Sequence, residues 1–454
     1  MATFLCTTLP TDDLGLLTRS LPIARELRAR GHRVTFSSPA PAPRRLVSEA
    51  GFDNLLPAHP LYDLLGGEQS LGGLLAYLRS GRWRGRHRSL AGLLAELLPA
   101  LPLRRAPPSD DVWSMDHAGA LLGMQTPGFV RAHCRALAEV VAGAAPDVVV
   151  DFWNPFAVAA ARAAGKPVVS VLQADAHPGG RGFVWWKPPP SPPPPSPAAA
   201  VSRVLAELGL PGVARLEELC PGDLTLVVGS PETDPLPAGT PATWVGFLLW
   251  EQEGARLPAS VEALGRERPL VWVYSGTPRY GFGGRALDSA VVIEACIQAL
   301  GGEPLDVVLT TGHHRLPPEL PPLPENFAHL PYLPGLAMAA RADLLVHHGG
   351  YGSCQTGLHA GKPAVILPTY SERESNARRL EALGAAARVE VRTHRGRKSV
   401  DAAALRAAVH RVLATPGYAA RARALGDSLR ALGGAARAAD LIEAFAVAHR
   451  RPAA

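Results

Sequence analysis

Short apolar runs alternate with stretches of helical period through residues 343–391, and the rest of the chain is organised around this segment. The runs are residues 344–346, 364–367 and 387–391, each of a length suited to a buried strand. A turn with three glycines at 347–352 separates the first run from a helical stretch, which Gly361 ends. We expect Ser353 to cap that helix. The pattern predicts strand, turn, helix, strand, helix and strand.

The same alternation continues through the rest of the chain. The other expected strands are residues 2–8, 34–37, 147–151, 168–172, 224–228, 269–274, 306–310 and 327–334. The expected helices include residues 16–30, 40–51, 129–142 and 435–450, with two more inside 401–432. Strands that alternate with helices predict doubly wound parallel sheets, which bind ligands at the carboxyl ends of their strands. A length of 454 residues fits two such domains.

The glycine turn at 347–352 suits an anion. Glycines let the backbone lie close to a ligand, and the free N–H groups and dipole of the following helix favour phosphate. The alternative is an ordinary strand-to-helix turn whose glycines serve only its geometry. A lone turn does not decide between the two, so the neighbouring motifs matter.

Three motifs follow one another here. H-G-G-Y-G-S at 348–353 precedes G-K-P-A-V-I-L-P at 361–368 and E-R-E-S-N-A-R-R-L at 372–380. Their spacing, without a gap from His348 to Asn376, resembles the nucleotide-sugar signature of the UDP-glycosyltransferase superfamily. These are inverting glycosyltransferases of the GT-B fold, and some bacterial relatives act on antibiotics.

The resemblance implies an α/β chain with two Rossmann-like, doubly wound domains that face each other across a cleft. R-A-R-G-H-R-V-T-F at 28–36 resembles the superfamily's first unit, and T-W-V-G-F-L at 243–248 resembles the end of its interdomain linker. On this basis 224–228 is the last strand of the first domain. The implied units are 1–235 for the acceptor, 236–434 for the nucleotide sugar, and 435–454 as a helix that returns to the first domain.

Several residues match the family's donor-binding positions. Glycosyl transfer needs a grip on the base, charge stabilisation for the leaving diphosphate, and a deprotonated acceptor. The implied diphosphate contacts are His348, Gly350, Gly352, Ser353, Ser275, Gly276 and Thr277. His347 is interpreted as structural, and the turn at 275–277 has a simple strand-end cap as its alternative. Tyr332, followed by Leu333, stands where many relatives stack a Trp on the uracil.

The sugar and ribose positions depart from the family pattern. Glu372 and Arg373 replace a D-Q pair: Glu372 can accept hydrogen bonds from two sugar hydroxyls. Arg373 either pairs with Glu372 or binds an anionic or otherwise unusual sugar. Asn376 fits the family helix that contacts the phosphate. Thr356 replaces the ribose-gripping Glu, as in bacterial antibiotic glycosyltransferases, and Gly335 replaces a Gln, so dTDP stays open beside UDP.

The family's catalytic base is missing. Relatives carry a His after a Gly in the first loop, but the matching residue here is Leu16, and Arg19 follows one turn later. An acceptor hydroxyl needs a base to take its proton. Asp13 is the preferred substitute, Asp12 the next, and His177 a weaker third. The alternative for the two acids is helix capping.

Composition narrows the class further. A net charge of +6 is modest, and no basic motif interleaved with aromatics predicts nucleic-acid binding. The five scattered cysteines form no C-x-x-C pair, which predicts reduced, buried thiols in a cytoplasmic protein. We expect neither a signal peptide nor a membrane-spanning helix. The resemblance implies no metal and no cofactor apart from the donor substrate.

Two segments lie outside the motifs. Residues 71–105 carry seven arginines against one acid, Glu96. They are a solvated basic helix over the domain, a lid for an apolar acceptor, or a peripheral contact with a membrane surface. The proline-rich loop at 187–198 is an excursion near the acceptor mouth or a spacer.

The leading hypothesis is an inverting, metal-independent transfer of a hexosyl group from a UDP- or dTDP-sugar to a small, mostly apolar acceptor, such as a natural product, lipid or sterol-like molecule, by a monomer or dimer. Leu16 motivates an alternative, a catalytically silent nucleotide-sugar-binding protein. A nucleotide-sugar epimerase on the same fold is a third hypothesis.

Overall fold

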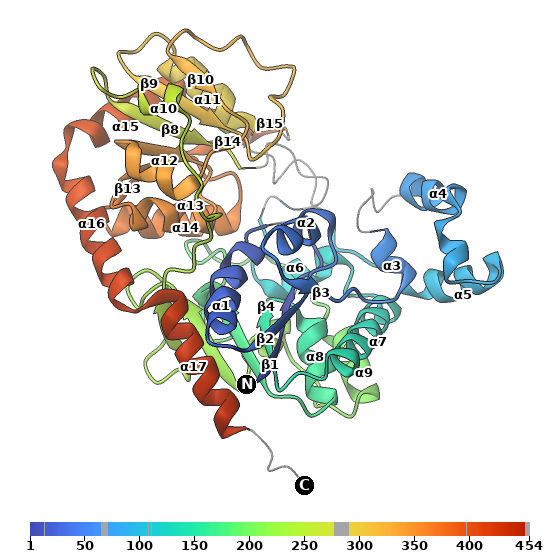
Figure 1. Cartoon of the computed structure of the whole chain (residues 1–454). Coiled ribbons are helices and arrows are strands. Elements are labelled where there is room, and N and C mark those ends of the chain that lie inside the picture. The colour runs from blue at the N-terminus through green and yellow to red at the C-terminus, as the bar shows by residue number, and fades with distance from the viewer. Residues whose placement is uncertain are drawn as a thin grey trace.

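The computed structural model describes residues 1–12, 14–64, 71–107, 109, 111–276, 290–395 and 397–449. These residues form two α/β domains, one above the other in Figure 1, each built on its own parallel sheet. The predicted pair of Rossmann-like domains is therefore confirmed.

The N-terminal sheet has seven parallel strands in the order β3-β2-β1-β4-β5-β6-β7. They are β1 (Thr3–Thr8), β2 (Arg33–Ser37), β3 (Asp53–Asn54), β4 (Val148–Phe152), β5 (Val168–Leu172), β6 (Leu224–Val228) and β7 (Thr243–Gly246). The prediction that 224–228 is the last strand is wrong, because β7 pairs with β6 beyond it. Val245 of β7 is fully buried, so burial stabilises a strand too short to recognise by period. The sheet thus continues past residue 235, while the domain boundaries themselves stay a prediction.

The C-terminal sheet has six parallel strands in the order β10-β9-β8-β11-β12-β13. They are β8 (Leu270–Tyr274), β9 (Asp306–Thr310), β10 (Phe327–His329), β11 (Leu344–His347), β12 (Ala364–Ile366) and β13 (Ala386–Arg388). The antiparallel pair β14 (Val391–His394) and β15 (Arg397–Val400) was not predicted. Its residues are mostly exposed, so no buried apolar run announces it.

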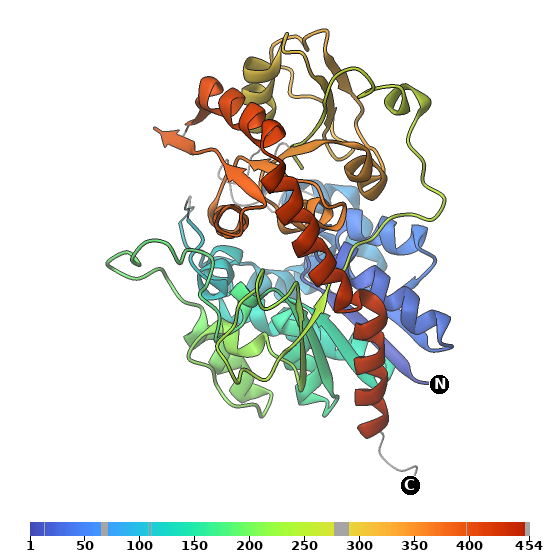
Figure 2. The ribbon, with the colours of Figure 1, turned by 90° about the vertical axis from the view of Figure 1, so that its left-hand side faces the viewer.

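Helices cover both faces of each sheet, as Figures 1 and 2 show. Those of the first domain are α1 (Leu17–Ala29), α2 (Pro41–Glu49), α3 (Pro60–Asp63), α4 (Leu71–Ser80), α5 (Leu90–Ala100), α6 (Met115–Leu122), α7 (Pro127–Ala144), α8 (Pro155–Ala163) and α9 (Ala198–Glu207). Those that follow are α10 (Ala259–Glu262), α11 (Ala290–Leu300), α12 (Gly335–Arg341), α13 (Tyr351–His359), α14 (Ser371–Ala382), α15 (Ala402–Ala414), α16 (Pro416–Ala431) and α17 (Gly434–Ala448). Helix α1 between β1 and β2, and α13 between β11 and β12, supply crossovers of the kind that a parallel sheet requires.

The last helix ties the two domains together. Figure 2 shows α16 and α17 running from the C-terminal domain down onto the N-terminal one. Ile442 of α17 is fully buried in the core that β1 and α1 share. At the helix surface, Arg30 Nη1 lies 2.7 Å from Asp440 Oδ1 and 2.9 Å from Glu443 Oε2. The C-terminal helix therefore returns to the N-terminal domain.

Residues 71–105 project from the body rather than covering it (Figure 1). Here α4 and α5 enclose a small apolar cluster that includes Tyr77, Trp83 and Leu97, while Leu98 and Leu103 are exposed. None of the described residues of this segment, nor any of the proline-rich loop at 187–198, lines the interdomain cavity. The lid interpretation of 71–105 is thus not supported.

The five cysteines are free and buried, which agrees with the predicted reduced thiols. Burial raises the pKa of Cys6 and of Cys134 to about 12. Within the residues that the structure describes, no helix has the length and apolar character needed to cross a membrane.

Candidate active site

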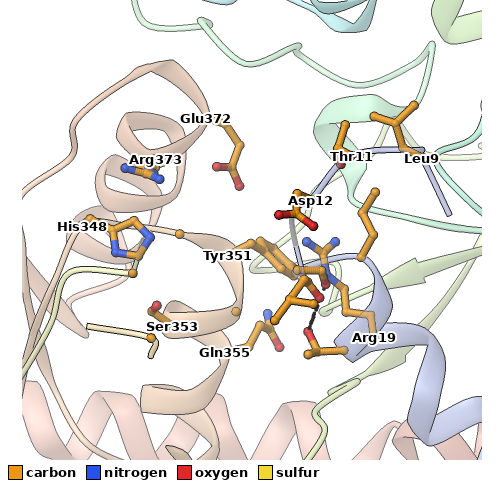
Figure 3. A pocket seen from close by; sticks show the side chains of 18 of the residues that line it. Leu9, Thr11, Asp12, Arg19, His348, Tyr351, Ser353, Gln355, Glu372 and Arg373 are labelled. Carbon is orange, nitrogen blue, oxygen red and sulfur yellow. Dashed lines mark hydrogen bonds between the residues drawn. The ribbon is translucent and has the colours of Figure 1, made fainter. Parts of the chain in front are cut away.

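A cavity of about 1240 Å³ separates the two domains. Its walls come from the loops that follow β1, β4 and β5 on one side and β8, β9, β11 and β12 on the other. These are the carboxyl ends of parallel strands, where α/β sheets bind ligands. Figure 3 shows His348, Ser353, Glu372 and Arg373 on one side of the pocket, Asp12 and Arg19 on the other, and Tyr351 between them.

The glycine turn opens α13 toward this cavity. The N-cap of the helix is Gly350, which has no side chain to satisfy the first N–H groups. Gly350, Gly352 and Ser353 all line the cavity, so these backbone donors face open space. Ser353 lies inside the first turn of α13, so its predicted role as the cap is wrong. The cap falls three residues earlier, because Gly350 has the extended backbone that precedes a helix.

The imidazole of His348 is held between two glycines. A Cβ at Gly276 would lie 2.7 Å from its Cε1, and a Cβ at Gly350 would lie 2.5 Å from its Nε2. Burial, with smaller contributions from Arg373 and His347, lowers the pKa of His348 well below its ordinary value. Burial therefore favours a neutral imidazole. Its Nδ1 lies 3.4 Å from the Tyr274 carbonyl oxygen, which is a long contact, and the tautomer with its proton on Nε2 can donate to a phosphate oxygen in the cavity.

The neighbouring polar groups support the turn instead of facing the ligand. His347 Nδ1 accepts from the Gly349 N–H at 3.1 Å. Asn376 Nδ2 donates to the Gly349 carbonyl at 3.0 Å, and Asn376 does not line the cavity. The predicted phosphate contact through Asn376 is therefore replaced by an indirect role. Gly349 itself has φ of +88°, a left-handed conformation that glycine adopts without strain.

The structure describes the turn after β8 only as far as Gly276. Gly276 lines the cavity, but Ser275 is fully buried and its hydroxyl donates to the Gly276 carbonyl at 3.1 Å. The cap-like alternative thus fits Ser275 better than a direct phosphate contact. Thr277 lies outside the described residues.

The part of the cavity around Tyr332 is aromatic. Tyr332 is 48% exposed and stacks on His313, with ring centroids 4.2 Å apart and an interplanar angle of 11°. Leu333 is buried beside it, and both residues line the cavity. Since one face of Tyr332 is covered by His313, a base has the other face available for stacking. Thr356, at the family's ribose position, also lines this wall.

Glu372 lies at the start of α14 and lines the cavity. Its Oε1 accepts from Asn376 Nδ2 at 2.9 Å and lies 3.5 Å from Gln173 Nε2 of the other domain. Burial raises the pKa of Glu372 above its ordinary value, against the effect of these hydrogen bonds. A carboxylate at this position can accept hydrogen bonds from sugar hydroxyls.

Arg373 is less available than the sequence predicts. It is 4% exposed, its Nη1 donates to Thr369 Oγ1, and its guanidinium lies 4.8 Å from the ring centroid of Tyr370. Arg373 also lines the cavity, and its charge lowers the pKa of Glu372, so the pairing with Glu372 and the binding of an anionic sugar both stay predictions. Its contacts with Thr369 and Tyr370 also brace the loop before α14.

The first loop differs from the prediction in the role of Asp12. Leu16 lines the cavity at the position of the family's base. Asp12 Oδ1 accepts from the Ala42 N–H at 2.8 Å, so this acid caps α2 rather than the helix that follows the loop. Asp13 lies outside the described residues.

His177 does not face the cavity. It is buried, does not line the interdomain space, and its Nδ1 accepts from the Gly179 N–H at 3.0 Å. Burial also lowers its pKa. The third candidate base is thus a turn residue, because its acceptor nitrogen serves the backbone.

Several site residues were not predicted. The Tyr351 hydroxyl lies 2.9 Å from both the Val228 carbonyl and Asp234 Oδ2 of the N-terminal domain. Asp175 accepts from Ser375 at 2.8 Å and from Arg379 at 2.7 Å, again across the two domains. Tyr351 lies inside the glycine motif, so its place in the sequence could have indicated that it belongs to the site. The other contacts join residues far apart in sequence, and nothing local marks them.

Within the described residues, no group of three or more His, Cys, Asp or Glu is placed to hold a metal ion. The polar groups that line the cavity include the backbone of the glycine turn, His348, Glu372 and Arg19. Such a wall fits a ligand with a diphosphate and hydroxyl groups.

The fold is that of a class of glycosyltransferases with known structures. Two solved structures, spinosyn forosaminyltransferase SpnP and glycosyltransferase VinC in complex with dTDP, match 98% of this chain. The TM-scores are 0.66 and 0.64, the identities 20% and 19%, and the coverage of those chains 99% and 100%. The chain therefore has the GT-B fold of these glycosyltransferases.

Sequence likeness to known proteins covers only part of the chain. Residues 295–438 match the family model of the erythromycin biosynthesis protein CIII-like C-terminal domain. NDP-glycosyltransferase YjiC of Bacillus licheniformis is 35% identical over 150 residues, 33% of this chain and 36% of that protein. Oleandomycin glycosyltransferase of Streptomyces antibioticus is 34% identical over 150 residues, 33% of this chain and 34% of that protein. The chain thus spans about a third of the length of these relatives.

A mycobacterial relative matches a longer region. The PGL/p-HBAD biosynthesis glycosyltransferase of Mycobacterium tuberculosis is 30% identical over 210 residues, 46% of this chain and 44% of that protein. These matches show that part of the chain is similar in sequence to glycosyltransferases, and that nearly the whole chain shares their fold.

Proposed function

We propose that this protein transfers a hexosyl group from a UDP- or dTDP-sugar to a small, mostly apolar acceptor, with inversion at the anomeric carbon and without a metal ion. The observation that carries the proposal is the open N-terminus of α13, with neutral His348 beside it, facing a cavity that both domains line.

The donor binds along the C-terminal wall. The diphosphate lies at the N–H groups of α13, and His348 donates a further hydrogen bond as negative charge develops on the leaving oxygen. Tyr332 stacks on the base and Glu372 accepts hydrogen bonds from the sugar. Helix N–H groups and His348 take the role that a metal ion has in other transferases.

The acceptor binds along the N-terminal wall, which is largely apolar. The apolar side chains there are Leu9, Leu14, Leu16, Met115, Leu121, Leu122, Met124, Trp153, Phe183 and Leu216. An acceptor on this wall attacks the anomeric carbon from the side opposite the diphosphate, which inverts its configuration. The general base is Asp13, in the first loop.

A transfer assay tests the proposal. The protein is incubated with UDP- and dTDP-hexoses and a panel of apolar phenols and alcohols, with and without EDTA. Mass spectrometry detects the glycoside, and NMR of the product gives its anomeric configuration. We expect an inverted product at the same rate in EDTA. A retained configuration, or activity abolished by EDTA and restored by a divalent metal, contradicts the proposed mechanism.

Leu16 favours a second candidate, a nucleotide-sugar-binding protein without transfer activity. It is 7% exposed and places no titratable group at the family's base position. This candidate predicts donor binding by calorimetry with no glycoside formed from any acceptor in the panel.

A further inference from the structure

Arg19 presents a guanidinium to the cavity from the N-terminal domain. It lies on α1, is half-buried, and lines the cavity. Its Nε donates to the Gly15 carbonyl at 3.0 Å, and its Cζ lies 5.0 Å from the ring centroid of Tyr351. These two contacts leave the terminal Nη groups directed at the pocket, as Figure 3 shows. Among the described residues, no carboxylate forms an ion pair with Arg19.

The other two arginines of the cavity wall are engaged. Arg45 Nε lies 3.7 Å from Glu49 Oε1 on the same helix. Arg373 is almost fully buried and donates to Thr369. Arg19 is therefore the arginine of this wall that forms no ion pair with a carboxylate among the described residues. A guanidinium keeps its charge in proteins, and holding it half-buried without an anion is costly.

The position of Arg19 separates it from the diphosphate site. His348 and the N–H groups of α13 lie on the C-terminal wall, on the far side of Tyr351 from Arg19 (Figure 3). Arg19 instead faces Glu372, whose pKa it helps to hold down against burial. Leu14 and Leu16 of the apolar acceptor wall stand next to it in the chain. The space that Arg19 faces is thus where the transferred sugar meets the acceptor.

We propose that Arg19 binds a carboxylate carried by the acceptor or by the transferred sugar. In either case a carboxylate lies in the fork of the guanidinium, and the apolar body of the acceptor lies against the leucine wall. The carboxylate is held and not consumed, so the acceptor hydroxyl remains the nucleophile. This inference rests on the proposed glycosyl transfer and makes Arg19 a specificity-determining residue.

Matched substrates separate the two sources of the carboxylate. In one arm, hydroxynaphthoic acid and its methyl ester compete as acceptors with a neutral UDP- or dTDP-hexose. In the other, the UDP-hexose and the corresponding UDP-hexuronate compete as donors with naphthol. The variants are Arg19→Gln, Arg19→Lys and, as the matched control, Arg45→Gln, which removes a cation of the same cavity that Glu49 already pairs.

We expect the wild type to prefer the acid over the neutral analogue in one of the two arms. Arg19→Gln should reduce that preference in kcat/KM by about ten- to a hundredfold, the size of a lost charge-assisted hydrogen bond. Arg19→Lys should keep part of the preference, because the charge remains but the fork is lost. Arg45→Gln should leave the ratio unchanged.

Two results overturn the proposal. One is an equal loss for acid and neutral substrates in Arg19→Gln. The other is a comparable loss in the affinity for free UDP or dTDP, which would assign Arg19 to the diphosphate. If no substrate is glycosylated, the proposed function fails, and calorimetric binding of hydroxynaphthoic acid against its ester still tests Arg19: equal affinities in the wild type contradict its role.

Discussion

The two walls of the cavity differ in kind. On the C-terminal wall, the polar groups around the glycine turn hold one another: Asn376 bonds both Gly349 and Glu372, and His347 bonds Gly349. The N-terminal wall is mainly apolar, with Asp12 and Arg19 as charged groups of its first loop and helix. Preorganised donors suit a ligand of fixed chemistry, whereas an apolar wall selects mainly by shape.

The matches to known proteins also differ between sequence and fold. The family model covers 295–438, inside the C-terminal domain, whereas the structural likeness covers 98% of the chain. The fold is therefore shared over nearly the whole chain, whereas the family model matches only part of its C-terminal domain.

The largest expected effect lies on the C-terminal wall. His348→Ala should lower kcat by about two to three orders of magnitude, because it removes a preorganised donor to the leaving diphosphate. Steady-state transfer assays measure this loss. His410→Ala, on α15 beside Glu303, is the matched control and should transfer normally. Unchanged turnover in His348→Ala contradicts the assignment of the turn.

The next effect concerns the first loop. Asp13→Asn should keep donor binding but lose about a hundredfold in kcat, the usual range for removal of a general base. Asp12→Asn should lose less, because an amide oxygen can still accept from the Ala42 N–H. Single-turnover rates with saturating donor measure both. If both variants react at the wild-type rate, Asp13 is not the base.

Glu372→Ala separates the binding of the sugar from the binding of the nucleotide within the proposed donor site. It should raise the donor KM about tenfold, since hydrogen bonds from sugar hydroxyls to a carboxylate are lost. Free UDP or dTDP should bind nearly as before, because the nucleotide lies elsewhere on the wall. Calorimetry with the nucleotide and the nucleotide sugar separates the two. An equal loss for both ligands would make Glu372 structural.

In stability, by contrast, the two domains should respond alike to pH. Burial lowers the pKa of His133 in the N-terminal domain and of His347 in the C-terminal domain from 6.5 to about 3. Both stay neutral when folded and take up a proton when unfolded, so stability is full above about pH 6.5 and falls as pH drops toward 3. Each should contribute a slope of about 1.4 kcal/mol per pH unit in that window.

Urea unfolding at pH 7.5 and pH 5.5 measures this slope. His133→Gln and His347→Gln should each flatten it, and His449→Gln, on the exposed end of α17, should not. The same slope in all four proteins would show that neither buried imidazole titrates on unfolding.

Local pattern predicted the parallel strands and the glycine turn, since buried runs and glycines leave their signal within a few residues. The contacts that several polar side chains make with particular partners were not predicted from it. Arg373 is engaged by Thr369 and Tyr370, His177 by the Gly179 N–H, and Asp12 by the Ala42 N–H.

Contacts between residues far apart in the sequence could not be predicted from the local pattern. The position of Arg19 depends on Tyr351, which belongs to the other domain. Strand β7 was missed because only its burial beside β6 makes it a strand. Such contacts depend on the packed fold and not on the period of the sequence.

Gly352→Ala tests the central claim, that the glycine turn binds the donor diphosphate, most directly. A Cβ at Gly352 meets no protein atom within 4 Å and lines the cavity, so the methyl group enters ligand space without disturbing the fold. The matched control is Gly143→Ala, in the exposed part of α7, where a Cβ also meets nothing within 4 Å. Both variants and the wild type are titrated with UDP and with dTDP by calorimetry. We expect Gly352→Ala to weaken binding of the preferred nucleotide about ten- to a hundredfold, with unchanged thermal stability, and Gly143→Ala to bind like the wild type. Equal affinity in all three proteins would contradict the claim.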